Sequence, residues 1–254
     1  MLLAIDIGNT NIVVGVYRDR TLAASFRAST VRRETSDEIG LFISGQLARA
    51  GVANGDITKV IISSVVPPLT PVFERMAAEY FHCQPLVVTA RLKLPVRVEI
   101  DKPDEVGADR IANAAAVYVK FGGPAIVVDI GTATTFDVVS RDGAYIGGVI
   151  MPGPETAMSS LARRAARLFE VRFEPPDRVV GKSTAGALKS GLFHGLVGQV
   201  DYLIEKIIAE CGFDGCTVIA TGGLAAGIEK HSRYIKQYDP NLTLEGLRLI
   251  AEGN

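Results

Sequence analysis

Two segments of this 254-residue chain each join an aspartate, a glycine and small polar side chains to the end of an apolar run. The first segment reads MLLAIDIGNTNIVVGVY from residue 1, and the second reads AIVVDIGTATTFDVVS from residue 125. Backbone N–H groups and small side chains in such a turn can bind phosphate oxygens, while the aspartate can reach a cation. The pair therefore predicts two half-domains that face each other across a nucleotide.

An ordinary hairpin with Gly, Asn or Asp in its turn is the alternative for either segment taken alone. The two segments, however, superimpose without a gap at an offset of 123 residues, which pairs Asp6 with Asp129 and Gly8 with Gly131. The same offset pairs Arg18-Asp19 with Arg141-Asp142. This shared register favours the functional interpretation over two unrelated hairpins.

The residue types suggest a division of roles within the two turns. Glycine lets the backbone approach an oxygen closely, and Asn9, Thr10 and Asn11 add neutral hydrogen-bonding groups. Asp6 would repel a phosphate unless a cation lay between them, so we assign it to Mg²⁺, directly or through water. Asp129, Gly131, Thr132 and Thr134 form the counterpart in the second half. Phosphoryl transfer depends on this kind of positioning and charge neutralisation.

A third cluster, Glu105-Val106-Gly107-Ala108-Asp109-Arg110, begins a predicted helix over Pro103–Lys120 that Asp101 would cap. A charged pair in such an alanine-rich stretch is often only a solvated helix face. Alternatively, the small neighbours open a pocket in which Asp109 accepts a hydroxyl proton and Arg110 binds an anion.

Two glycine-containing segments resemble other nucleotide motifs. Gly181-Lys182-Ser183-Thr184 is not a P-loop, because that motif requires glycine where Pro176 stands. Thr221-Gly222-Gly223 follows a predicted strand and is either a turn where a nucleoside lies against the backbone or a simple glycine turn.

Hydrophobic periodicity predicts an α/β fold made of duplicated βββαβαβ halves. We expect a first half at 1–101, which opens with three consecutive strands, and a second at 102–254, in which three strands follow the predicted Pro103–Lys120 helix. The predicted strands are Leu2–Ile7, Ile12–Tyr17, Thr21–Arg27, Lys59–Val66, Leu86–Thr89, Ala125–Asp129, Thr134–Ser140, Ala144–Ile150 and Cys216–Ala220. The predicted helices are 36–50, Thr70–Phe81, Pro103–Lys120, Glu155–Leu168, Thr184–Ala209 and one after Gly223, with an extended linker over Ala90–Asp101. This order is similar to that of the sugar kinases, actin and Hsp70 ATPase domains, in which two such halves hold ATP in a cleft.

Composition narrows the functional classes. With 48% hydrophobic and 22% charged residues, the chain is typical of a globular protein. A net charge of −1 gives no indication of a nucleic-acid or anionic-membrane partner. No apolar run approaches the roughly 20 residues of a membrane span. The three cysteines and three histidines show no metal-type spacing, and a cytoplasmic location is expected.

Taken together, DIGNTN near the N-terminus, EVGADR after the linker and DIGTATTFD in the second half resemble the type III pantothenate kinases. The resemblance spans essentially the whole chain. It implies ATP-dependent phosphorylation of the primary alcohol of pantothenate to 4'-phosphopantothenate, the first step of coenzyme A biosynthesis, by a homodimer whose interface helps to build the substrate pocket.

The resemblance also implies roles for individual residues. The ATP phosphates would be held by Asp6, Ile7, Gly8, Asn9, Thr10, Asn11, Ile12 and Val13, with Thr132 also touching ATP. Pantothenate would be contacted by Gly107, Ala108, Asp109, Arg110 and Thr184, and Asp109 would be the base. Asp129 would bind a monovalent cation, K⁺ or NH₄⁺, in addition to the Mg²⁺ that accompanies ATP. The residue types alone would equally suit two other roles for Asp129, capping its own turn or binding a second Mg²⁺. The chain carries Ile100 where members commonly have a tyrosine that contacts pantothenate.

Other functions compete with this one. The fold pattern alone would also suit a sugar or acetate kinase, a polyphosphate phosphatase, or a regulator that keeps the nucleotide fold without catalysis. A polyol would need more polar side chains than one Asp-Arg pair supplies. A regulator would be expected to lose Asp109 or one of the turn aspartates, and all three are present.

Overall fold

The computed structural model describes residues 1–254, which form two compact units: Met1–Val119 with Asn241–Asn254, and Lys120–Pro240. The boundary expected at 101/102 differs from this division. The segment that follows residue 101 stays with the first unit, because helix α3 (Ala108–Phe121) buries its apolar residues in a cluster with that unit's sheet. The C-terminal helix α6 (Leu242–Gly253) returns to the same cluster.

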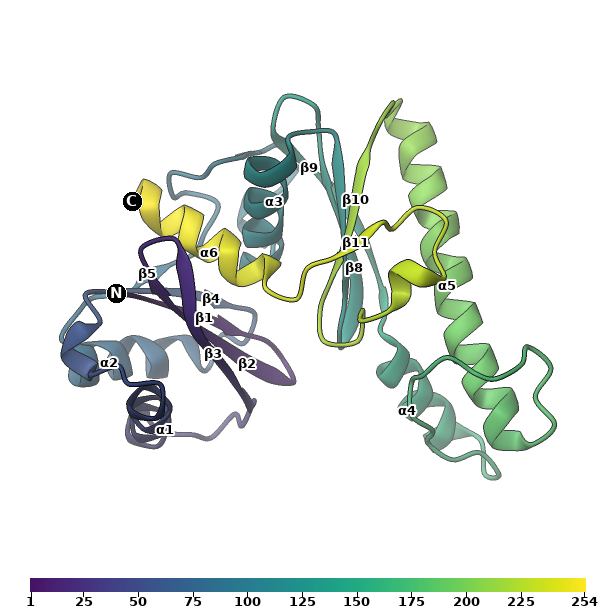
Figure 1. Cartoon of the computed structure of the whole chain (residues 1–254), viewed down its shortest axis with the longest axis horizontal. Coiled ribbons are helices and arrows are strands. Elements are labelled where there is room, and N and C mark those ends of the chain that lie inside the picture. Colours follow the sequence, from purple (N-terminus) through teal and green to yellow (C-terminus); the bar gives the residue numbers. More distant parts are fainter. The chain divides into compact units, whose positions relative to one another are not determined.

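The first unit has the predicted order of three strands, helix, strand, helix, strand. Its elements are β1 (Leu2–Ile7), β2 (Asn11–Arg18), β3 (Thr21–Ser29), α1 (Ser36–Arg49), η1 (Asn54–Asp56), β4 (Lys59–Ser64), α2 (Thr70–Phe81), β5 (Leu86–Val87), β6 (Arg97–Val98), η2 (Pro103–Glu105), α3 and α6. Five of the strands form a sheet in the order β3-β2-β1-β4-β5, in which β2 is antiparallel to β1 while β4 runs parallel to it (Figure 1). The parallel strands β1, β4 and β5 therefore all end at the same edge of the sheet.

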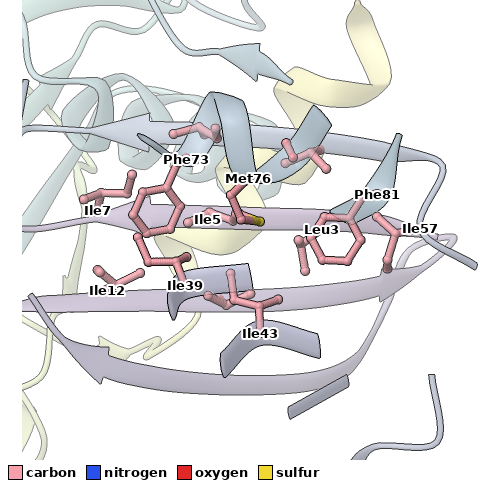
Figure 2. Close-up of a cluster of buried hydrophobic side chains, with 14 of the residues drawn as sticks. Leu3, Ile5, Ile7, Ile12, Ile39, Ile43, Ile57, Phe73, Met76 and Phe81 are labelled. Atoms are coloured by element: carbon pink, nitrogen blue, oxygen red, sulfur yellow. The ribbon is translucent and has the colours of Figure 1, made fainter. Parts of the chain in front are cut away.

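The alternation of side chains along β1 divides the core into two layers. Leu3, Ile5 and Ile7 face a cluster with α1 and α2 that includes Ile43 and Phe73 (Figure 2). Ala4, between them, faces the opposite layer, where α3 and α6 pack. Asp6 continues the row of Ala4, so it belongs to the layer of α3 and α6 at the carboxyl end of the strand.

Helices α3 and α6 cross at very close range. A Cβ atom at Gly246 would lie only 1.9 Å from the backbone oxygen of Ala112, so only glycine fits at this crossing. Thr243 donates a hydrogen bond of 2.8 Å to the fully buried Asn113 next to it. None of the predicted elements corresponds to α6.

The helix expected over Pro103–Lys120 is two elements. Pro103 begins a single 3₁₀ turn, η2, and α3 begins only at Ala108. Asp101 does not cap either one: the residue before η2 is Lys102, which makes no capping bond through its side chain. The interruption at Val106-Gly107 places Asp109 in the first turn of a helix.

The second unit repeats the strand order of the first. Its elements are β7 (Ala125–Ile130), β8 (Ala133–Val139), β9 (Ala144–Pro152), α4 (Pro154–Arg164), α5 (Thr184–Cys211), β10 (Thr217–Thr221), η3 (Ile228–Lys230) and β11 (Gln237–Tyr238). Strands β9-β8-β7-β10-β11 correspond to β3-β2-β1-β4-β5 (Figure 1). Two expectations were wrong: α4 ends at Arg164, four residues before the predicted end, and the helix expected after Gly223 is only the turn η3.

One face of this second sheet is buried beneath α5. Ile126, Val128 and Ile130 from β7 pack in one cluster with Leu196, Val200 and Ile204 of α5. Asp129 lies between Val128 and Ile130 and so faces the other side of the sheet. No helix in the structure is both long enough and apolar enough to span a bilayer.

Candidate active site

The first predicted phosphate turn is a tight connection between β1 and β2. The amide of Gly8 donates to the carbonyl of Asn11 at 3.0 Å. Residues 9 to 11 are exposed at the surface of this turn. A Cβ atom on Gly8 would lie 2.9 Å from the backbone oxygen of Asn11, so a larger residue at position 8 would crowd the turn.

Thr30, just after β3, braces this turn from the neighbouring strand. Its hydroxyl donates to the Gly8 carbonyl at 2.7 Å, and its amide donates to the Thr10 carbonyl at 2.9 Å. These bonds occupy carbonyl groups of the turn and leave its polar side chains facing outward. Thr30 was not among the predicted site residues, because only strand pairing brings it to the turn.

Asp6 stands in a row of side chains across the carboxyl edge of the first sheet. The strand registers place it beside Val13 on β2 and beside Ser63 on β4. This row lies on the face that carries α3, because Val13, Ala4 and Ile61 share a cluster with Ala108 and Ile111 of that helix. The aspartate of the phosphate turn and the helix that carries Asp109 are thus on one face of one sheet.

Asp109 itself is partly buried in the first turn of α3. Its Oδ1 atom accepts the backbone N–H of Arg110 at 2.8 Å, and a Cβ atom on Gly107 would lie 2.4 Å from the same oxygen. Burial raises the pKa of the Asp109 carboxyl above its usual value, and the Arg110 backbone and charge only partly oppose that shift. This is not the fully solvated helix face that composition alone favoured.

A measurement of stability against pH tests this environment. Burial penalises the charged carboxylate of Asp109, so protonation of this carboxyl stabilises the folded protein. This contribution to the free energy of unfolding is fully present below the unfolded pKa of about 3.9. It is lost as the pH rises through the raised pKa of the folded state. Asp109→Asn should therefore raise the melting temperature at pH 7 to 8, by roughly 2–4 °C for each 1 kcal/mol removed. The gain should vanish near pH 3.

Asp104→Asn is the matched control for that experiment. Asp104 is exposed and bonded to Arg91 at 2.8 Å, and this partner lowers the pKa of the Asp104 carboxyl. Its removal should leave the melting temperature unchanged or slightly lower at neutral pH. A stabilisation of equal size in both variants would contradict the burial of Asp109.

The second predicted turn, between β7 and β8, is fixed by the segment that follows β9. The amide of Gly131 donates to the Ala133 carbonyl at 2.9 Å, and the Thr132 carbonyl accepts from the Gly153 amide at 3.0 Å. The Thr156 hydroxyl donates to the same carbonyl at 2.6 Å. The Thr132 side chain is exposed, which suits a contact with a ligand.

The Thr221-Gly222-Gly223 turn lies directly against Asp129. A Cβ atom on Gly222 would be 2.3 Å from Asp129 Oδ1, and the residue has a φ of +94°, so glycine is required on both counts. Leu224 donates its amide to the Ile130 carbonyl at 3.0 Å, and the Tyr238 hydroxyl donates to the Gly222 carbonyl at 3.2 Å. Two segments that are far apart in sequence thus form one surface.

Thr134 is not part of that surface. The β7–β8 register pairs Thr134 with Ile130, whose side chain packs beneath α5, whereas Asp129 pairs with Thr135 and, on β10, with Thr221. Thr134, which was included in the predicted second turn, therefore lies on the face of the sheet opposite to Asp129. Thr135 and Thr221, which share the face of Asp129, are the residues that sequence reasoning missed.

Thr184 is the first residue of α5, and Ser183 caps that helix by accepting the Gly186 amide at 3.1 Å. The side chain of Thr184 is exposed. Beside it is a polar cavity of about 440 Å³ lined by the preceding loop and the first turns of α5, including Arg178, Lys182 and Lys189. Thr184 therefore lies at the N-terminus of α5, next to this cavity.

Comparison with known proteins identifies the family. The family described as type III pantothenate kinase matches residues 2–206. A type III pantothenate kinase from Roseiflexus sp. (strain RS-1) is 45% identical over 254 residues, which cover 100% of this chain and 99% of the relative.

Two solved structures are similar in fold at low sequence identity. An activator of 2-hydroxyisocaproyl-CoA dehydratase from Clostridium difficile, solved with ADPNP, has a TM-score of 0.56 at 12% identity and covers 98% of this chain and 92% of that one. A ROK hexokinase from Thermus thermophilus has a TM-score of 0.52 at 13% identity, covering 99% and 97%. The fold is that of the sugar kinases and related ATPases, and the chain belongs to the type III pantothenate kinase family.

Proposed function

We propose that the Asp6–Val13 turn and Asp109 carry out the reaction of this family on the α3 face of the first sheet. As a type III pantothenate kinase, the chain phosphorylates pantothenate with ATP in the first step of coenzyme A biosynthesis. The observation that supports the assignment of residues is the common face of Asp6 and α3, with the partly buried Asp109 in the first turn of that helix.

In this proposal Asp109 orients the primary hydroxyl of pantothenate and accepts its proton late, as bonding to phosphorus develops. An ordinary carboxylate is too weak a base to remove the proton beforehand, so the acceptor must act within the transition state. The burial that raises the pKa of Asp109 strengthens it as an acceptor. Gly107 and Ala108 leave room beside it, and Arg110 holds the carboxylate or amide end of the substrate.

The phosphate groups of ATP are assigned to the Asp6–Val13 turn and to Thr132. Exposed Asn9, Thr10 and Asn11 would donate to phosphate oxygens, while Asp6 would hold Mg²⁺ directly or through water. Hard oxygen ligands of this kind fit Mg²⁺. The bound Mg²⁺ would neutralise charge on the transferred phosphoryl group.

Asp129 is assigned to a monovalent cation, K⁺ or NH₄⁺. Its surroundings fit a large, weakly hydrated ion: one carboxylate, the neighbouring hydroxyl-bearing residues Thr135 and Thr221, and the backbone of Gly222 in contact range. Such a set offers mostly neutral oxygens to an ion that loses its water readily, whereas Mg²⁺ dehydrates reluctantly and usually keeps several waters.

We further propose a homodimer in which α5 provides contact and Thr184 serves the pocket of the neighbouring subunit. From their many Ala and Gly residues, the predicted helices over Pro103–Lys120 and Thr184–Ala209 were both expected to supply contact. The alanines of α3 at 112 and 114–116, however, are fully buried within their own chain. Apolar side chains near α5 remain exposed, among them Val179, Val180 and Tyr202 at 68%, 78% and 56%. A cytoplasmic location accords with the three free cysteines.

A subunit-mixing experiment tests the dimer. Asp109→Asn and Thr184→Arg proteins should each be nearly inactive, and mixtures in which subunits exchange should recover activity, because one pocket in each mixed dimer keeps both native residues. Light scattering at micromolar concentration should give the dimer mass. A monomeric mass with full activity, or no recovery in verified mixed dimers, would contradict the proposal.

The reaction itself is tested by ATP-dependent phosphorylation of pantothenate, with glucose and acetate as control acceptors. We expect transfer to pantothenate alone. Transfer to glucose at a comparable kcat/KM would contradict the assigned substrate.

A further inference from the structure

Ser63 is a buried hydroxyl that the folded chain does not satisfy. It is the fifth residue of β4 and has an exposure of 0%. Its Oγ atom has no hydrogen-bond partner, although a buried donor without one is costly. Neighbouring Ser64 shows the usual alternative, because its Oγ accepts from both Val66 N and Thr70 Oγ1.

The strand register places Ser63 beside Asp6. Residues opposite one another on β1 and β4 are Ala4 with Ile61 and Asp6 with Ser63, so the two polar side chains are neighbours on the same face. Adjacent strands are about 4.8 Å apart, which lets a serine hydroxyl reach a neighbouring carboxylate by rotation about χ1 alone. The next position in this row is Val88, in the cluster that also contains Ala108 of α3.

We infer that Ser63 is a positioning residue for Asp6: with Mg²⁺·nucleotide bound, its hydroxyl donates a hydrogen bond to the Asp6 carboxylate and holds it towards the cation. This inference rests on the role proposed above for Asp6. It explains why a polar group remains at a fully buried position, since the cost of its burial is recovered when the hydroxyl donates to Asp6. A carboxylate that accepts a hydrogen bond from Ser63 loses less rotational freedom when the cation binds.

Thr134 offers a matched control in the second unit. Its Oγ1 atom is also without a partner at 0% exposure, but it faces the α5 layer and not Asp129. Ser63→Ala and Thr134→Val each remove a buried, unpartnered hydroxyl, so neither should lower the melting temperature of the ligand-free protein.

The test measures binding of ADP by calorimetry, with Mg²⁺ and with EDTA, for the full-length protein and these variants. Ser63→Ala should weaken Mg²⁺·ADP binding by about three- to tenfold, the effect of losing one hydrogen bond, and leave metal-free ADP binding unchanged. Thr134→Val should change neither affinity. In an Asp6→Asn background, Ser63→Ala should have no further effect, because Ser63 acts through Asp6.

The outcomes separate this inference from the function proposed above. If Asp6→Asn weakens Mg²⁺·ADP binding but Ser63→Ala does not, Asp6 keeps its role and the inference about Ser63 is wrong. An equal effect of Ser63→Ala with and without Asp6 would also overturn it. If Asp6→Asn leaves Mg²⁺·ADP binding intact, the proposed role of Asp6 fails and the inference fails with it.

Discussion

Asp109→Asn is expected to lower kcat by about 10²–10⁴-fold, the usual contribution of a general base, with little change in Mg²⁺·ATP affinity. Asparagine keeps the shape of the side chain and can still accept a hydrogen bond, but it cannot take the proton of the pantothenate hydroxyl. The loss should therefore appear in turnover far more than in the KM for ATP. Steady-state kinetics, together with calorimetric titration of the nucleotide, separate the two.

Asp104→Asn serves again as the control. It makes the same chemical change five residues before Asp109, at an exposed carboxylate that is paired with Arg91. It should retain near-parental kcat. If Asp109→Asn also retained near-parental turnover, Asp109 would have no part in proton transfer.

Replacing K⁺ with Na⁺, at constant ionic strength and saturating Mg²⁺, is expected to abolish most of the activity. Asp6 and Asp129 both end strands at predicted phosphate turns, and a carboxylate about 4 Å from a phosphate charge costs of order 4 kcal/mol at an effective dielectric near 20. Mg²⁺ at Asp6 offsets one of these repulsions, so a second cation is needed at Asp129. The neutral oxygens available around Asp129 favour a large, weakly hydrated ion over Na⁺.

Asp129→Ala should abolish the response to K⁺. Thr134→Val is the control, because Thr134 lies one strand away but on the opposite face of the sheet. It should keep the normal K⁺ dependence. Equal rates in Na⁺ and K⁺, with ammonium excluded, would show that Asp129 binds no monovalent cation in catalysis.

The strands and most helices were predictable because their signals are local. Continuous apolar runs that end in an aspartate turn identified β1 and the later strand β7, and the predicted bounds of β1 and α2 agree with the structure. Helix α6 was missed although its apolar residues recur at helical spacing, because the prediction ended with the turn after Gly223. No α-helix forms after Gly223, because a short segment that contains only the 3₁₀ turn η3 leads to β11.

The duplication illustrates the limit of sequence register. Without a gap, the offset of 123 residues would align Ile12 with Thr135. In the structure, Ile7 pairs with Ile12 across the first turn, and Ile130 pairs with Thr134 across the second. The second turn is therefore one residue shorter than the first. Since side chains alternate between faces, that single residue decides which threonine accompanies Asp129.

The sequence by itself determined the two aspartate turns, the Asp109-Arg110 pair and the family to which they belong, because these depend on residue type and short spacing. Tertiary structure alone decided what lies beside each aspartate: Ser63 next to Asp6, and Thr135, Thr221 and Gly222 next to Asp129. It also decided that α3 is buried on the Asp6 face and that this burial raises the pKa of Asp109. The reason is that these neighbours come from strand pairing and helix packing between segments that are far apart in the sequence. Short stretches of sequence carry no signal for such contacts.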